Sequence, residues 1–287
     1  MSAQALVAVV TDSTAYLPAG LVAEHGLTVV PLQVVVGGRS LAEGVEVTSD
    51  EVAQALREWR PVTTSRPAPT TFVETYRELA ARGATGIVSV HLSGDLSGTV
   101  DAARAAAAEV ADVIEVKVVD SRHLGMALGY AAIAAARSVA AGGSVAEAAE
   151  RAQRTAYGAS AWFYVDTLEY LRRGGRIGAA AAMVGSALSV KPLLHVVDGR
   201  LEPLDRVRTA SRALARLEEL VVEESGARSV DVAVQHLAAP DRAEQLAERL
   251  RNRLPGVRGL VVGEVGAVVG AHVGPGMLGV VVSPVLE

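Results

Sequence analysis

The chain of 287 residues contains no cysteine, which excludes disulfides, thiolate catalysis and metal sites built from cysteine. Aromatic residues make up only 3% of it, so any ligand pocket would be lined mainly by aliphatic side chains. Basic residues are outnumbered: the formal net charge is −5, and Lys117 and Lys191 are the only lysines. Because nucleic-acid binding requires a basic face, no nucleic-acid partner is expected.

Signals for secretion and membrane insertion are also missing. No Lys or Arg precedes Arg39, so the chain lacks the basic start of a signal peptide. The apolar stretch Val265–Leu286 is long enough to span a bilayer, but its glycines and prolines break it into strand-and-turn pieces. We therefore expect a cytoplasmic protein without a transmembrane segment. Transient contact with a membrane surface is compatible with this expectation.

The hydrophobic pattern predicts a two-domain α/β protein. Hydrophobic residues form 50% of the chain and charged residues 21%, which is ample for a folded core. Up to residue 160, short β-branched runs alternate with Ala-rich helical segments, as in parallel βαβ units. From residue 161 to 287 this alternation gives way to a mixed order of strands and helices. We expect an N-terminal α/β domain over residues 1–160 and a C-terminal mixed α/β domain over residues 161–287.

Individual elements follow from the same pattern and from turn residues. The first domain is predicted to hold strands at Val7–Val10, Gly86–Val90 and Val113–Val119, and strand-like residues on either side of Pro31 within Val29–Val36. Helices are expected to open at Pro18, Asp50, Thr70, Thr99 and Leu124. Ser144 and Glu147 form a capping box for one further helix. The second domain is predicted to hold a hairpin at Asp198-Gly199, a helix from Ala210, a strand at Val230–His236, a helix from Pro240 and two final valine-rich strands.

Hydroxyl-rich clusters follow several predicted strands. They are Thr11-Asp12-Ser13-Thr14, Ser93-Gly94-Asp95-Leu96-Ser97-Gly98-Thr99 and Asp120-Ser121, with a fourth polar cluster at Thr63-Thr64-Ser65-Arg66-Pro67. Ligands of open parallel sheets bind at the carboxyl ends of the strands, although each cluster alone also suits helix capping. The loop at 93–99 has more serine and glycine than one cap needs, and its glycines let backbone N–H groups approach an anion. This loop is a candidate carboxylate or phosphate site.

Conventional catalytic motifs are weak or missing. His272 is either a buried core histidine or a donor to an anionic group, and together with Ser93 or Ser97 it allows a stand-alone Ser/His hydrolase of a lipid or small ester as an alternative. However, the sequence has no Gly-x-Ser-x-Gly elbow and no P-loop. The remaining histidines show no metal-ligand spacing, so no metal site is expected.

Three arginines lie on a turn that two glycines interrupt, within Leu168-Glu169-Tyr170-Leu171-Arg172-Arg173-Gly174-Gly175-Arg176-Ile177. This cluster is either a solvated basic rim or a surface for an acidic partner or a phosphate, since the chain as a whole is acidic.

Taken together, the motifs resemble those of the DegV family, from Thr11 to Gly279. The motifs that carry the resemblance are Thr11-Asp12-Ser13, Thr64-Ser65-Arg66-Pro67, the loop at 93–99, Val119-Asp120-Ser121, the arginine turn, Lys191-Pro192-Leu193-Leu194 and Gly274-Pro275-Gly276. Arg66 and Ala68 depart from the family, which usually has Gln and Ser there.

The resemblance implies a two-domain α/β protein that holds one long-chain fatty acid between its domains. Such proteins are not enzymes themselves: they are the acyl-carrying subunit of a bacterial fatty acid kinase, and a separate ATP-binding subunit phosphorylates the carboxylate. No cofactor is implied besides the bound fatty acid. The carboxylate-binding residues that the resemblance implies are Thr64, Ser93 and His272, and Ser65, Gly94 and Ser97 in the same polar clusters are expected to bind the carboxylate with them. The resemblance also implies that Arg172, Arg173 and Arg176 dock the kinase.

Overall fold

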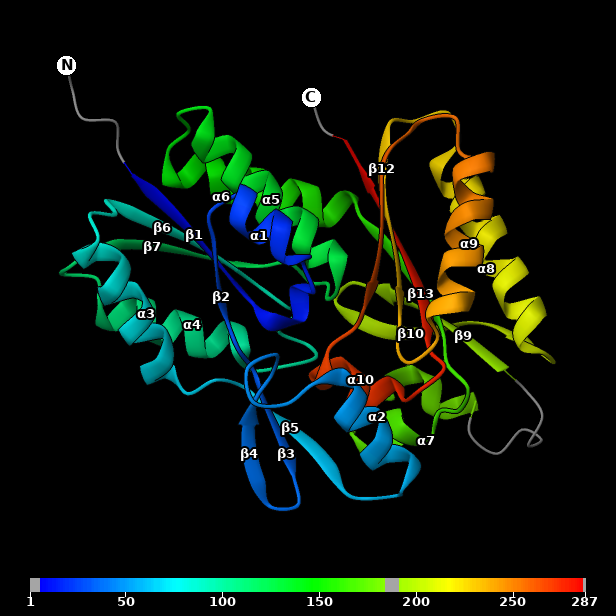
Figure 1. Ribbon diagram of the computed structural model, residues 1–287. Helices are drawn as coiled ribbons and strands as arrows, with labels where there is room; N and C mark the ends of the chain where they lie inside the picture. The colour runs from blue at the N-terminus through cyan, green and yellow to red at the C-terminus, as the bar shows by residue number, and fades with distance from the viewer. Residues whose placement is uncertain (1–5, 184–190, 286–287) are drawn as a thin grey trace. The chain divides into compact units, whose positions relative to one another are not determined.

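The computed structural model describes residues 6–183 and 191–285. By its internal contacts the chain groups into two compact units (Figure 1). Unit 1 comprises residues up to Leu32 together with Ser65–Tyr157, and unit 2 comprises Gln33–Thr64 together with the chain from Gly158 onwards. The sequence places one boundary, at residue 160. In the structure, the chain passes from unit 1 to unit 2 for the last time between Tyr157 and Gly158, and the earlier residues 33–64 also belong to unit 2.

Unit 1 is built on a parallel sheet, as predicted. Its strands β1 (Val7–Asp12), β2 (Leu27–Val30), β6 (Gly86–His91) and β7 (Glu115–Asp120) run in the order β2-β1-β6-β7. All three pairings are parallel, so the four strands end at the same edge. The polar clusters after β1, β6 and β7 therefore gather there.

Helices cover both faces of this sheet (Figure 1). One face carries α3 (Pro69–Ala81) and α4 (Thr99–Glu109), and the other carries α5 (Met126–Ala140). The remaining helices are η1 (Ser13–Ala15), α1 (Ala19–Glu24) and α6 (Val145–Gly158). The predicted capping box before α6 is confirmed: Glu147 N donates to Ser144 Oγ, and Ser144 N donates to the Glu147 carboxylate. This doubly wound arrangement buries Val10, Phe72 and Ile87 completely or nearly so.

Unit 2 contains a six-stranded mixed sheet with the order β10-β9-β8-β13-β11-β12. Its strands are β8 (Ser160–Tyr164), β9 (Lys191–Val197), β10 (Arg200–Val207), β11 (Val230–His236), β12 (Val257–Glu264) and β13 (Leu278–Pro284). Helices α8 (Ala210–Ser225) and α9 (Pro240–Arg253) pack on it over an aliphatic core. The β9–β10 hairpin turns at Asp198 and Gly199, whose positive φ angles of 48° and 82° confirm the predicted Asp-Gly turn.

A smaller group of elements completes unit 2. Strands β3 (Gln33–Val36), β4 (Arg39–Ala42) and β5 (Val62–Ser65) form a sheet in the order β4-β3-β5. Helix α10 (Ala267–Val273) packs against α2 (Ser49–Arg57) and α7 (Glu169–Arg173) (Figure 1). A short helix, η2 (Gly178–Met183), follows the arginine turn.

The sequence prediction was wrong at several boundaries. The run 29–36 is extended on either side of Pro31 as expected, but its two parts are separate strands, β2 and β3, which join different sheets. Helix α2 is capped by Thr48 in a capping box with Glu51 rather than by Asp50, and α3 begins at Pro69 rather than Thr70.

The end of the chain also differs from the prediction. Only strands were expected after Pro240's helix, but α10 lies between β12 and β13, within the stretch 265–286. Leu286 itself lies outside the described residues. In the part of the chain that the structure describes, no helix has the length and apolar character needed to cross a membrane.

Candidate functional site

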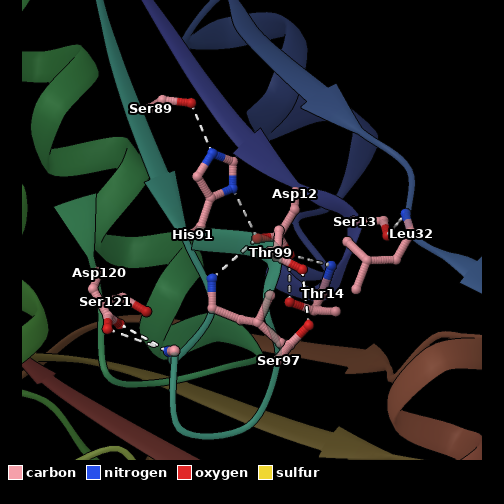
Figure 2. Close-up of polar contacts among 12 residues, drawn as sticks. Asp12, Ser13, Thr14, Leu32, Ser89, His91, Ser97, Thr99, Asp120 and Ser121 are labelled. Carbon is pink, nitrogen blue, oxygen red and sulfur yellow. Dashed lines mark hydrogen bonds and ion pairs between the residues drawn. The ribbon is translucent and has the colours of Figure 1, made fainter. Parts of the chain in front are cut away.

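A buried polar network joins the strand ends of unit 1. The Asp12 carboxylate accepts hydrogen bonds from His91 Nδ1 and Leu92 N, both at 3.0 Å, and from Thr14 N at 3.0 Å (Figure 2). His91 Nε2 lies 2.7 Å from Ser89 Oγ. Asp12 and His91 have no exposed surface, and burying a polar group without a hydrogen-bond partner is unfavourable. The hydrogen bond between them therefore offsets part of the cost of burying both side chains.

The same network extends to Tyr76, whose hydroxyl donates to Ser89 Oγ at 2.8 Å. Burial raises the pKa of Tyr76, so its hydroxyl stays protonated and remains a donor. The chain of bonds therefore runs from Tyr76 through Ser89 and His91 to Asp12. It fixes Leu92, and with it the position of the neighbouring Ser93.

Ser93 begins the loop that connects β6 to α4. Its side chain is fully buried, its Oγ accepts from Asp95 N at 3.2 Å, and its backbone N–H donates to the carbonyl of His123 at 2.8 Å. Gly94 N donates to the Asp120 carboxylate, with distances of 3.2 and 3.3 Å to its two oxygens (Figure 2). The predicted anion contact of the Gly94 amide is therefore made to a carboxylate of the chain itself.

The other predicted polar residues of unit 1 have separate contacts. Ser97 Oγ lies 2.9 Å from Thr99 Oγ1 at the start of α4. Ser65 is exposed at the end of β5. Arg66 lies over the loop, with Nη1 3.5 Å from the Gly98 carbonyl oxygen. A side chain at position 98 would collide with Arg66, since its Cβ would come within 2.3 Å of Nη1.

In unit 2 the structure brings together two predicted residues that are 208 positions apart. Thr64 Oγ1 lies 2.8 Å from His272 Nε2. His272 Nδ1 is buried and has no hydrogen-bond partner among the described residues. Burial, and to a smaller extent the positive charge of Arg176, lowers the pKa of His272 to about 4, so its imidazole is neutral near pH 7.

The unpartnered Nδ1 indicates the tautomer. A buried N–H without an acceptor is costly and rare, whereas an unpaired lone pair is better tolerated. The proton therefore belongs on Nε2, which donates it to Thr64 Oγ1. The hydroxyl of Thr64 can then direct its own proton towards an anion.

Glu43 and Gly174 affect the position of His272 in different ways, one through its helix and one through the space beside its ring. Glu43, a buried side chain just after β4, accepts a 2.6 Å hydrogen bond from Val268 N in the first turn of α10. A carboxylate there satisfies an otherwise unpaired N–H and complements the helix dipole. On the other side, the glycine at 174 leaves room for the ring: a Cβ at that position would lie 2.0 Å from His272 Nδ1.

The arginine turn lies next to this pair. Arg172 and Arg173 both donate to the Glu169 carboxylate, with closest distances of 2.8 and 2.7 Å. These bonds lower the pKa of Glu169 to about 2. Arg176 Nη1 donates to the carbonyl of Gly174 at 2.8 Å. All three arginines are exposed.

The predicted site is thus divided between the units. Thr64 and His272 lie in unit 2, whereas Ser65, Ser93, Gly94 and Ser97 lie in unit 1. Sequence reasoning missed Glu43 and the Asp12–His91 pair. A strand-end aspartate and a histidine that closes a buried strand were visible in the sequence, but their pairing needs the register in which β6 lies beside β1.

A hydrolase site lacks support in this geometry. His272 bonds to Thr64, and no described carboxylate orients its Nδ1. The chain does contain an Asp–His–Ser series, Asp12–His91–Ser89, but all three side chains are fully buried and Ser89 accepts from Tyr76. Among the described residues, no cluster of three or more His, Asp or Glu fits a metal ion.

Unit 1 also has a cavity of about 510 Å³ beside β7 and α6. Its lining includes Arg104, Lys117, Asp120, Glu150 and Tyr157. This many charged groups do not suit an acyl tail, because a tail gains affinity from apolar surface.

Comparisons with known proteins agree with the fold and the motifs. Residues 6–285 match the family described as "Uncharacterised protein, DegV family". A DegV domain-containing protein of Streptomyces coelicolor is 61% identical, with 96% of this chain and 98% of that protein covered.

Two solved structures are similar throughout. A DegV family protein of Thermus thermophilus, described by its fatty acid binding, has a TM-score of 0.92 at 33% identity, covering 98% of this chain and 100% of that one. DegV of Bacillus subtilis, described as a fatty acid binding protein, has a TM-score of 0.90 at 33% identity with the same coverage. The chain belongs to the DegV family.

Proposed function

We propose that the chain binds one long-chain fatty acid and that the hydroxyls of Thr64 and Ser93 hydrogen-bond its carboxylate. The observation that carries the proposal is the Thr64–His272 pair, in which Nε2 lies 2.8 Å from Oγ1. A neutral imidazole that donates to this oxygen leaves the hydroxyl proton of Thr64 available to a carboxylate. The description of two similar structures as fatty acid binding supports it.

Neutral donors suit a carboxylate that must react later. A buried carboxylate needs hydrogen bonds, or it takes up a proton and loses its nucleophilic charge. An arginine clamp would bind it more tightly, but would also draw off electron density from both oxygens. Hydroxyl donors stabilise the anion while leaving it able to attack phosphorus. In this arrangement His272 is a positioning residue that acts through Thr64.

The acyl tail supplies most of the affinity. Burial contributes about 0.8 kcal/mol per CH₂, so about fourteen buried methylenes give about 11 kcal/mol before ordering costs are subtracted. The aliphatic character of the chain, with half of its residues hydrophobic and 3% aromatic, suits a flexible tail.

We further propose that a separate ATP-binding kinase subunit phosphorylates the bound carboxylate. The chain has no P-loop motif, so ATP and Mg²⁺ would come from the partner. The exposed arginines 172, 173 and 176 lie in or just after α7, which packs against the helix that carries His272, so they are suitable for docking that partner near the carboxylate.

The Arg173→Glu variant tests this role. We expect it to carry fatty acid normally but to be phosphorylated with a kcat/KM at least tenfold lower, because a charge reversal repels an acidic docking surface. Acyl-phosphate formation is measured with the kinase subunit and ATP. Arg251→Glu, a charge reversal at another exposed arginine, on α9, serves as the control and should react like wild type. Equal turnover of the two variants would contradict docking at Arg173, and ester hydrolysis by the chain alone would favour the hydrolase.

A further inference from the structure

Trp59 occupies a backbone position that is unfavourable for a large side chain. It follows Glu58, the C-cap of α2, and has a φ of 57°, in the left-handed region. Trp59 N donates to Leu56 O at 3.1 Å, and Arg60 N donates to Ala55 O at 2.9 Å, which is the hydrogen-bond pattern of a helix end. Glycine is the usual residue at such a position, because a Cβ there is strained.

The indole of Trp59 contributes few packing contacts to stabilise the fold. It is 65% exposed, and the ring contact that the structure shows for it within the described residues is with Arg173, whose guanidinium carbon lies 4.7 Å from the ring centroid. A strained backbone and a large exposed aromatic ring point to a use outside the chain.

The Trp59–Arg173 stack lies close to the Thr64–His272 pair. Arg173 is followed by Gly174, which directly contacts the His272 ring. Helix α10, which carries His272, packs against both α2 and α7 (Figure 1). Thr64 follows Trp59 by only five residues. A molecule that covers the stack therefore comes close to the atoms proposed to hold the carboxylate.

The charge around the stack is positive, although the chain as a whole is at −5. The segments 57–60 and 169–176 hold five exposed arginines and two glutamates. Both glutamates are already paired, Glu58 with Arg60 at 3.0 Å and Glu169 with Arg172 and Arg173. A partner for this surface must present carboxylates around an apolar pocket.

We propose that this surface, centred on Trp59 and Arg173, docks an acidic protein, with the indole as the apolar anchor of the interface. The inference rests on the proposed function, in which that protein is the ATP-binding kinase subunit. Tryptophan and arginine dominate the energetics of many interfaces, particularly where an aromatic ring fills a pocket on the partner. The stack holds both groups in place before the partner arrives, which reduces the ordering cost of binding.

Trp59→Gly separates this role from a structural one. Glycine relieves the strained φ, so the melting temperature should stay the same or rise, and the fatty acid content should not change. The Kd for the kinase subunit, measured by calorimetry, should rise at least tenfold, and Trp59→Phe should recover most of the affinity. Tyr157→Ala, which removes an aromatic ring that is 60% exposed in unit 1, is the matched control and should bind like wild type.

The possible results are distinct. Binding of Trp59→Gly within twofold of wild type would overturn the inference, as would an equal loss for Tyr157→Ala. Loss of binding to phosphatidylglycerol vesicles without loss of binding to the kinase subunit would also overturn it, in favour of a membrane surface. A wild-type chain that lacks fatty acid but binds the subunit through Trp59 contradicts the proposed function and supports the docking surface. A lipid-loaded chain that does not bind the subunit refutes the surface.

Discussion

Replacing Asp12 by alanine is expected to lower the free energy of unfolding by about 3 kcal/mol or more, because each buried donor that loses its acceptor costs about 1–3 kcal/mol. The substitution leaves His91 Nδ1 and two backbone N–H groups, of Thr14 and Leu92, without their acceptor in a region closed to water. Urea denaturation followed by circular dichroism measures the change.

The matched control is Asp101→Ala. Asp101 is exposed and lies 3.3 Å from Arg104 one turn further along α4. Surface pairs of this kind contribute about 0–1 kcal/mol, so this variant should unfold near the wild-type midpoint. A loss below about 1 kcal/mol for Asp12→Ala would show that the network around Asp12 does not hold the strand ends together.

Thr64→Val is expected to weaken fatty acid binding by about 10- to 100-fold while leaving the fold intact. Valine matches threonine in shape but has no hydroxyl to donate to a carboxylate. A hydrogen bond to a charged group contributes about 1.5–3 kcal/mol, and 1.4 kcal/mol corresponds to a factor of ten. The measurement is the Kd of the delipidated protein for a long-chain fatty acid.

Further variants test whether the loss of fatty acid affinity in Thr64→Val is due to the missing hydroxyl. Thr64→Ser keeps the hydroxyl and should restore most of the affinity, whereas His272→Ala should behave like Thr64→Val because it removes the group that orients the hydroxyl. Ser93→Ala is also expected to lower lipid retention. If Thr64→Val and His272→Ala both bind as tightly as wild type, the pair does not hold the carboxylate.

Much of the fold could be predicted because its signals are local. The β-branched runs ending in Asp12, His91 and Asp120 are strands, and the Asp198-Gly199 hairpin is present as expected. Helix α10 could not be foreseen, because its seven residues include two adjacent valines and a glycine and favour no helix by themselves. It is stabilised by contacts distant in sequence, including the cap from Glu43.

The candidate site was proposed from residue types and family motifs rather than from contacts. Hydroxyl clusters and a lone histidine indicated an anion site, and the family motifs selected Thr64 and His272. No local signal shows that these two side chains meet, because their contact depends on α10 packing between α2 and α7. The role of Gly174 is also invisible in the sequence, since it becomes clear only from the ring that fills the space beside it.

Native mass spectrometry of the freshly purified chain tests the central proposal most directly. The account predicts a dominant species heavier than the polypeptide by one long-chain fatty acid, which organic extraction recovers and identifies, and a marked shift towards the lipid-free species in Thr64→Val. A wild-type chain that carries no lipid and does not take up added fatty acid would contradict it.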